Sequence, residues 1–295
     1  MPDEGFSAQG VFSSPKVKII PTGDVTPPKK RDIGVENSKG EIIAFLDDDA
    51  YPVKEWLTEA AKIFEQNKSA ACVCGPAITA SNDSIQAVSS GLVYSSMFIS
   101  GNHVLRYVPK KRKEVFDFPS CNLLIRKEVF NSIGGFDKPF WPGEDTFLCL
   151  KVLETGKKMI YDPKVLVFHH RRKIFGGHLR QIKSYALHRG YFAKKYPENS
   201  LRPEYFIPSI FILGLLAGAV FSLLFPAFVS LYFTLLAIYL SIIIVNACFL
   251  ALGEVESPPI RIQLSLLVIS GIILTHLTYG LFFLKGLFAK KMPEE

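Results

Sequence analysis

The chain has 295 residues and a formal net charge of +7, and 48% of its residues are hydrophobic. This length allows one medium domain plus a further region, or two small domains. The apolar fraction and the positive mean hydropathy of +0.23 argue against a wholly soluble protein, and because no recognised nucleic-acid-binding module accompanies the basic charge, we expect no nucleic-acid partner.

Before residue 205, short apolar runs alternate with helical patterns, which is typical of an α/β domain. The elements predicted for its first half are a short strand at 17–20, a Pro/Gly-rich loop at 21–30, a helix at 30–37, a strand at 42–46, a helix opened by Pro52 with an apolar stripe of Trp56, Leu57, Ala60, Ile63 and Phe64, and a strand at 70–74. The run at 42–46 is apolar throughout, so we expect a strand buried on both faces of a mostly parallel sheet.

The second half of this domain continues the alternation. Residues 83–107 are ambiguous, and residues 109–113 form a basic loop. The elements predicted after them are a strand at 122–125, a helix at 127–133 closed by two glycines, a helix from Glu144 to about Thr155, and extended segments at 159–161 and 165–168. The five cysteines do not form the paired spacing of a zinc site, which favours a reduced, cytosolic domain.

The C-terminal part is apolar over long distances. Residues 205–253 and 262–284 contain no Asp, Glu, Lys or Arg. A spanning helix needs about 20 apolar residues, because each residue rises about 1.5 Å and the hydrocarbon is about 30 Å thick. We predict transmembrane helices near 206–225, 227–252 and 263–286, with a tight turn at Pro226. The alternative is a buried helical core in a soluble protein.

Basic residues gather ahead of the first predicted span. They are Arg171, Arg172, Lys173, Arg180, Lys183, Arg189, Lys194, Lys195 and Arg202. Lys and Arg beside a membrane segment favour the cytoplasmic side. We therefore expect a multi-pass protein of the cell membrane with a cytoplasmic domain. Three spans would put the C-terminus outside, whereas Lys285, Lys290 and Lys291 favour the inside, so the side of the C-terminus stays open.

Residues 175–196 have the pattern of an amphipathic helix. The apolar residues Leu179, Ile182, Ala186 and Ala193 recur at helical spacing. This pattern suits a helix that lies on membrane lipid, and an ordinary surface helix is the alternative. The predicted organisation is a catalytic domain at 1–173, an interfacial helix and linker at 174–204, and a transmembrane region at 205–295.

Three polar clusters each lie at the end of an apolar element, where α/β sheets bind ligands. Asp47-Asp48-Asp49 could hold a divalent cation that grips a diphosphate, or could be a solvated turn. Glu144 and Asp145 follow Trp141-Pro142-Gly143 and could supply a general base, or could simply favour a helix N-terminus. His169-His170 could ligate a metal or be structural.

Taken in order, these clusters resemble the inverting family 2 glycosyltransferases, which have the GT-A fold. The residues that carry the resemblance are Lys30-Arg31-Asp32-Ile33-Gly34, the run from Lys39 to Asp49, Ser120 to Arg126, Gly134 to Asp137, Gly143-Glu144-Asp145, Asp162-Pro163 and Val167 to His170. The C-terminal segments His276 to Gly280 and Lys285-Gly286-Leu287 look like the exopolysaccharide-type membrane members. The resemblance covers roughly residues 2–195.

The resemblance implies a role for each matching residue. Asp49 would bind the metal, with His169 as a second ligand and His170 as its alternative, and the ion would be Mg²⁺ or Mn²⁺. The nucleotide-sugar would contact Arg31, Asp47, Asp48 and Asn122. Asp145 would be the catalytic base, supported by Glu144, and Trp141 would line the acceptor side.

The sequence departs from the family pattern at two points. Asp32 stands where the family usually has Asn, and the chain resembles a GT-A domain that lacks its first strands. Asp3 would then be the acid that contacts the base of the nucleotide. An open sheet of this kind would have unpaired strand edges.

Two functions from different classes are compatible with these patterns. The first is a metal-dependent, inverting glycosyltransferase that moves a sugar from a nucleotide-sugar donor to a lipid-linked or polysaccharide acceptor at the membrane. The second is a catalytically inactive membrane subunit that partners another enzyme. A metal-dependent phosphohydrolase fits the Glu-Asp and His-His order less well. The donor sugar, the acceptor and the oligomeric state are not specified by the sequence.

Overall fold

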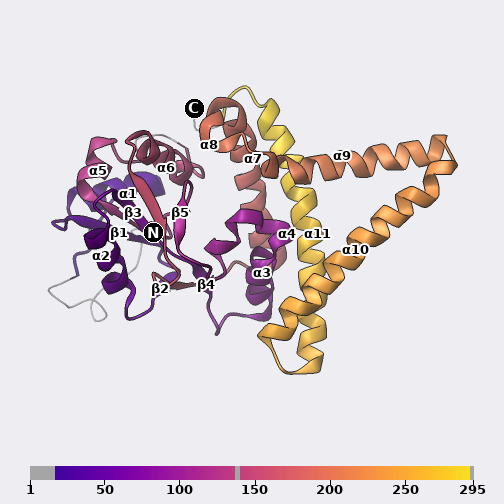
Figure 1. Cartoon of the computed structure of the whole chain (residues 1–295), viewed down its shortest axis with the longest axis horizontal. Helices are drawn as coiled ribbons and strands as arrows, with labels where there is room; N and C mark the ends of the chain where they lie inside the picture. Colours follow the sequence, from indigo (N-terminus) through magenta and orange to yellow (C-terminus); the bar gives the residue numbers. More distant parts are fainter. Residues whose placement is uncertain (1–16, 137–139, 293–295) are drawn as a thin grey trace.

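The computed structural model describes residues 17–136 and 140–292. Figure 1 shows a domain of strands and helices beside three long helices, α9, α10 and α11, which together outline a triangle. The domain contains strands β1 to β8, and its last helices, α7 and α8, lead into α9. This arrangement confirms the α/β class of the N-terminal part and the helical nature of the C-terminal part.

The main sheet has five strands in the order β1-β6-β3-β7-β5. Their bounds are Ile42–Leu46 for β1, Ala70–Cys74 for β3, Lys113–Val115 for β5, Asn122–Arg126 for β6 and Lys158–Tyr161 for β7. Strand β6 is antiparallel to both β1 and β3, β5 is antiparallel to β7, and only β3 and β7 pair in parallel among these strands. The expectation of a mostly parallel sheet is therefore wrong for the pairs that the structure describes.

Helices cover both faces of this sheet. On one face, α1 (Pro27–Glu36), α5 (Lys127–Ser132) and α6 (Glu144–Glu154) pack against buried residues such as Phe45 and Leu123. On the other face lies α2 (Trp56–Gln66), whose Trp56, Ala60, Ile63 and Phe64 are buried. Leu57, the remaining member of the predicted stripe, is 58% exposed, because it lies on the solvent side of α2.

Three local expectations need correction. Residues 17–20 form no strand. Strand β1 is buried at Ile43 and Phe45 but exposed at Ala44 and Leu46, because it is an edge of the described sheet rather than a central strand. Pro52 ends a short strand, β2 (Ala50–Pro52), and α2 begins only at Trp56.

A second, three-stranded sheet has the order β2-β8-β4, with β4 at Ala77–Thr79 and β8 at Val167–His169. Strand β8 is antiparallel to β2 and parallel to β4. The ambiguous region 83–107 folds as α3 (Ile85–Ser95), α4 (Met97–Ser100) and the 3-10 helix η1 (Gly101–Arg106). A π-helical turn, η2 (Ile174–His178), then leads into α7 (Leu179–Lys195) and α8 (Pro197–Ser200).

The long helices are α9 (Pro203–Leu224), α10 (Ala227–Glu254) and α11 (Pro258–Phe288), and each is long and apolar enough to cross a membrane. Pro226 lies in the turn between α9 and α10, as predicted. The apolar stripe of α7 contacts protein: Ala186 and Ala193 form a cluster with Phe283 of α11. Arg189, one of the basic residues expected beside the membrane, is instead buried inside the molecule against Asp117.

Candidate active site

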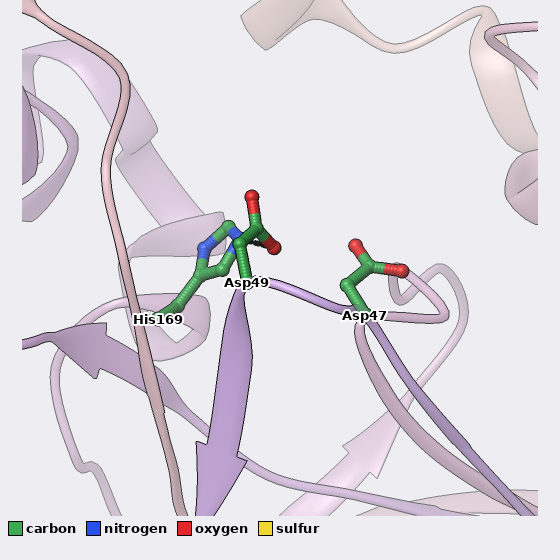
Figure 2. A group of neighbouring side chains, drawn as sticks. All are labelled: Asp47, Asp49 and His169. Carbon is green, nitrogen blue, oxygen red and sulfur yellow. Dashed lines mark hydrogen bonds and ion pairs between the residues drawn. The ribbon is translucent and has the colours of Figure 1, made fainter. Parts of the chain in front are cut away.

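The register of two strand pairs assembles the first part of the site. Leu46 pairs with Asn122 at the end of β1, so Asp47 follows directly where β6 begins. Ala50 pairs with His169 at the start of β2, which brings Asp49 beside the end of β8. Asp47, Asp49 and His169 each offer a ligand atom, and these atoms lie within 4.8 Å of one another. Figure 2 shows the two carboxylates side by side, with the His169 ring next to Asp49.

Hydrogen bonds orient the histidine of this group. The Nε2 of His169 lies 2.9 Å from Asp49 Oδ1, and its Nδ1 lies 2.6 Å from Nη1 of Arg171. His170 points elsewhere, with Nδ1 at 2.7 Å from Asp83 Oδ1. The geometry therefore selects His169 rather than His170 as the imidazole next to the aspartates.

Asp49 is held as a carboxylate. Burial raises the pKa of its carboxyl, but the hydrogen bond from His169 and the positive charge of Arg172 outweigh burial, so the pKa lies below its ordinary value. Oxygen and imidazole ligands in this arrangement fit a divalent cation such as Mg²⁺ or Mn²⁺.

The second part of the site is the N-terminus of α6. Gly143 caps this helix at a φ of 124°, and a Cβ there would lie 2.7 Å from the ring of Phe192, so the position requires glycine. Glu144 and Asp145 occupy the first turn, where the helix dipole favours negative charge. The Oδ1 atom of Asp145 is buried and has no hydrogen-bond partner among the described residues.

Arg31 of α1 joins the two parts. Its Nη2 donates to Asp47 Oδ1 at 3.1 Å and its Nη1 donates to Glu144 Oε1 at 2.9 Å. The guanidinium also lies over the ring of Phe136, 5.6 Å from the centroid. One side chain thus spans from the aspartate group to the helix that carries Glu144 and Asp145, which places both in a single site.

The carboxyl groups of α6 have raised pKa values. Burial raises the pKa of Glu144 to about 7, the charge of Asp145 adds to this effect, and Arg31 opposes it. Burial also raises the pKa of Asp145, against the opposing effects of Arg31 and Ser120. Carboxyl groups with pKa values shifted toward neutrality are common at sites of proton transfer.

Residues 42–253 match the family described as glycosyl transferase family group 2. This match covers more than half of the chain. The chain belongs to this family.

Relatives with assigned names match part of this family member. A pre-mycofactocin glycosyltransferase of Mycobacterium tuberculosis is 26% identical over 151 residues, which is 50% of this chain and 30% of that protein. A glucosyl-dolichyl phosphate glucuronosyltransferase of Haloferax volcanii is 24% identical over 144 residues, 46% of this chain and 45% of that protein. The chain thus spans less than half the length of these relatives.

Among solved structures, a mannosyltransferase from Pyrobaculum calidifontis in complex with GDP-Man and Mn²⁺ is similar to this family member, with a TM-score of 0.43 and 18% identity, over 92% of this chain and 69% of that one. A GalNAc-T7 structure with UDP, GalNAc and Mn²⁺ has a TM-score of 0.37 and 16% identity, over 60% and 38% of the two chains.

The structure brings together most of the residues predicted for this family member. Arg31, Asp47, Asp49, Glu144 and His169 are connected by the contacts above, and Asp145 lies beside Glu144. Asp48 is exposed at the turn between β1 and β2 and does not belong to the group of possible metal ligands. Trp141 is 51% exposed, three residues before α6. Asp3 lies outside the described residues.

The structure corrects the prediction that Asn122 contacts the nucleotide-sugar. The side chain is fully buried, and its Oδ1 accepts from the indole N–H of Trp56 at 2.9 Å. Its Nδ2 donates to the carbonyls of Gly75 and Val165, each at 2.8 Å, and of Pro76 at 3.2 Å. These bonds occupy both N–H donors of the amide and its oxygen, so Asn122 supports the strand ends rather than contacting a sugar.

Two residues next to the site were not predicted to belong to it. Arg171 is the hydrogen-bond partner of His169, and its guanidinium lies over Tyr107 at 5.2 Å from the ring centroid. Cys121 is partly exposed where β6 begins, and the pKa of its thiol is raised to about 12, first by burial and then by the charge of Asp47. The sequence indicated only that Arg171, in a basic run, could steer phosphates or face lipid headgroups, and that Cys121 lies in a family motif. Their contacts depend on the pairing of β2 with β8 and of β1 with β6, which the sequence does not show.

Proposed function

We propose that this chain is an inverting glycosyltransferase that moves a sugar from a nucleotide-sugar donor to a lipid-linked or polysaccharide acceptor at a membrane. The observation that carries the proposal is the contact of Arg31 with both Asp47 and Glu144. Membership of glycosyl transferase family group 2 gives the reaction class. The two relatives with assigned names are also glycosyltransferases.

Asp145 is the proposed base. Its Oδ1, which has no hydrogen-bond partner within residues 17–136 and 140–292, accepts the proton of the acceptor hydroxyl while that oxygen attacks the anomeric carbon. The bond between the anomeric carbon and the phosphate oxygen breaks, and the nucleoside diphosphate leaves with the electron pair. Attack from the face opposite the leaving group inverts the anomeric configuration. Glu144 stays bonded to Arg31 and keeps α6 in position relative to the aspartates.

Asp49 and His169, with Asp47 beside them, are the proposed holders of Mg²⁺ or Mn²⁺. A bound divalent cation supplies positive charge that stabilises a departing diphosphate. Arg31 is placed to contact the donor phosphates or ribose once they reach Asp47, because its side chain is 21% exposed. Mn²⁺ is present in both of the similar solved structures, which supports a metal of this type.

The membrane context is also part of the proposal. Three long apolar helices follow the domain. The basic residues of the 174–204 segment, such as Lys183 and Lys194, favour contact with anionic headgroups on the cytoplasmic side. A lipid-linked acceptor would be concentrated at that surface. The exposed ring of Trp141 would line the acceptor side of Asp145.

An assay of the full chain in membranes, with radiolabelled nucleotide-sugars and Mn²⁺, tests this function. We expect sugar transfer to the lipid fraction or to polysaccharide. Asp145→Asn should lower the rate by about 10²- to 10⁴-fold, which is the usual worth of a positioned base. Glu154→Gln, an exposed residue at the other end of α6, is the matched control and should leave the rate unchanged. Full activity of the Asp145→Asn chain would refute the assignment of the base.

A second candidate is an inactive membrane subunit that partners another enzyme. One observation favours it: β1 is an edge of the described sheet, with Ala44 and Leu46 exposed along a groove of about 350 Å³. Such an edge can accept a strand from another chain. Mn²⁺-dependent binding of a nucleoside diphosphate by the isolated chain would count against this candidate.

A further inference from the structure

Helix α11 is flanked by the domain along most of its length. At its C-terminal half it lies against α7 so closely that no side chains separate them. A Cβ on Gly190 would lie 2.1 Å from the carbonyl oxygen of Phe283, and a Cβ on Gly286 would lie 1.9 Å from that of Leu187. Lys183 of α7 lies over the ring of Phe282. The two helices therefore run side by side in direct backbone contact.

The N-terminal half of α11 packs on the domain as well, through side chains of α3 and η2. Leu264, Val268 and Ile272 belong to one apolar cluster with Leu92 and Val93 of α3. His178 of η2 links the two sides of this contact, since its Nδ1 lies 2.8 Å from Ser90 Oγ and its Nε2 lies 2.9 Å from Thr275 Oγ1.

The contacted stretch is too long for a spanning helix. The residues from 264 to 286 extend over about 33 Å at a rise of about 1.5 Å per residue, which exceeds the hydrocarbon thickness of about 30 Å. If α11 crossed the bilayer, α3, α7 and their polar side chains would lie within the hydrocarbon. Charged groups such as Lys183 are disfavoured there.

Both ends of α11 lie on the domain. Beyond its C-terminus, Met292 is buried against Phe140 and Tyr191, and Lys194 donates to the carbonyl of Ala289. Before its N-terminus, Val255 packs with the cluster that contains Ile85 of α3. The opposite side of α11 exposes a row of apolar residues at helical spacing, namely Ile262, Leu266, Leu277 and Leu281.

Helices α9 and α10 form a hairpin that leaves α11 and returns to it (Figure 1). Both arms are still tied to α11 at Phe211, whose ring centroid lies 5.9 Å from that of His276, and at Tyr239, whose hydroxyl lies 3.1 Å from His276 Nδ1. From Phe211 to Leu224 the first arm reaches about 20 Å, and from Ala227 to Tyr239 the second arm reaches about 18 Å. Neither arm exceeds the hydrocarbon thickness of about 30 Å, even along the bilayer normal.

The turn of this hairpin is suited to hydrocarbon. Leu223 is 85% exposed, and the neighbouring Leu224 and Phe225 are exposed as well. The N–H of Phe225 donates to Phe221 at 2.8 Å, Pro226 has no N–H, and the carbonyls of Phe225 and Pro226 accept from Phe228 and Val229. A turn without charged groups whose backbone is bonded internally does not need water.

We propose that the chain does not cross the bilayer: α11 lies in the plane of one interface, between the domain and the lipid, and α9 and α10 dip into the hydrocarbon as a re-entrant hairpin. The surface formed by α9, α10 and α11 thus binds one face of the membrane, the face on which the domain lies. The C-terminus then lies on the same side as the domain, which accords with Lys285, Lys290 and Lys291. This topology is independent of the transferase activity.

Cysteine labelling from each side of the membrane tests the topology. Single cysteines replace Lys62 on the domain, Phe225 in the hairpin turn and Lys290 after α11, in full-length chains whose Cys121 and Cys248 are serine because those two are not buried. Right-side-out and inverted vesicles are treated with a membrane-impermeant maleimide. We expect positions 62 and 290 to react from the same side, and position 225 to react from neither side until SDS is added.

Either of two results overturns the proposal. Labelling of position 225 from the side opposite position 62 would show that the hairpin crosses, and labelling of position 290 from that side would show that α11 crosses. If Phe225→Cys chains do not accumulate, Leu223→Cys reports on the same turn. A green fluorescent protein fused after Glu295 is a second measurement on the otherwise unmodified chain, and loss of its fluorescence through export would contradict the inference.

Discussion

The two hydrogen bonds of His169 fix which ring nitrogen carries the proton. Arg171 is only a donor, so Nδ1 must accept from it, and Nε2 must then hold the proton that it donates to Asp49. A metal ligated through Nε2 needs that nitrogen free and the proton on Nδ1, which faces Arg171. Ligating histidines usually donate this second N–H to an acceptor. Arg171 therefore opposes metal binding through His169.

We expect Arg171→Ala to bind Mn²⁺ several-fold more tightly than the unmodified chain, as measured by electron paramagnetic resonance of free Mn²⁺ without nucleotide. Arg172→Ala is the matched control, because it removes the same charge near Asp49 without touching His169. The gain should disappear in the double variant with His169→Ala. Equal effects of the two arginine variants would show that charge alone, and not the hydrogen bond, is responsible.

Arg31 sets the protonation of the carboxyl pair on α6. Burial raises the pKa values of Glu144 and Asp145, and the positive charge of Arg31 lowers both. A base must be ionised, so transfer should rise with pH through the pKa of the pair. Because Arg31→Gln removes the opposing charge, the pKa values rise further, and the acidic limb of the kcat/KM profile should move to higher pH. Arg31→Lys keeps the charge and should shift the limb less.

At the scale of elements, the sequence predicted where strands and helices occur better than how they pair. The bounds of β1 and β3 agree with the predicted runs at 42–46 and 70–74, and α6 ends before Gly156. The contact of Asp49 with His169 depends on the pairing of Ala50 with His169, which lies 119 residues away. Local propensity carries no information about such a register, or about the antiparallel insertion of β6 between β1 and β3.

Asn122 shows how a motif residue can act through structure. Asn122→Ala would leave the Trp56 N–H and the carbonyls of Gly75 and Val165 without their partner. We expect a loss of stability of about 2–4 kcal/mol in thermal or urea unfolding. Asn131→Ala, at an exposed position of α5, should have no comparable effect. A chain with Asn122→Ala that is fully stable but has a raised KM for the donor would restore the sugar-binding role.

The close packing of α7 on α11 depends on glycine. Gly190→Ala would place a Cβ 2.1 Å from the Phe283 oxygen and 2.8 Å from the Leu287 nitrogen, both backbone atoms that cannot move alone. The two helices must then separate, and we expect a fall in melting temperature of more than roughly 5 °C, as for a core overpacked by 1–3 kcal/mol. In the part of the chain that the structure describes, the Cβ of Gly214→Ala on α9 would meet nothing within 4 Å, so this variant should leave the melting temperature unchanged or slightly higher.

At the scale of the whole molecule, the hydropathy of the sequence predicted α9, α10 and α11 but not whether protein or lipid surrounds each helix. The window of α11 that is apolar enough to span is 33% buried, whereas that of α9 is 6% buried. Both windows consist of the same residue types, since lipid and a protein core select similar side chains. Only packing against α3 and α7 distinguishes a helix that lies on the domain from one that enters lipid.

The residues after α11 reach back to the segment that precedes α6. Met292 is 2% exposed and packs against Phe140, which precedes Trp141 and the carboxylates of α6. Met292→Ala would leave space beneath Phe140, so the loop that leads to Asp145 should loosen. We expect sugar transfer to fall about tenfold, since small displacements of a positioned base are costly. Quenching of tryptophan fluorescence by acrylamide reports mainly on Trp141, because the other tryptophan, Trp56, is buried. A looser loop should make Trp141 easier to quench.

Phe288→Ala removes a larger side chain that is 78% exposed, and it should change neither the transfer rate nor the quenching. If Phe288→Ala and Met292→Ala behave alike, the C-terminal residues do not support the loop.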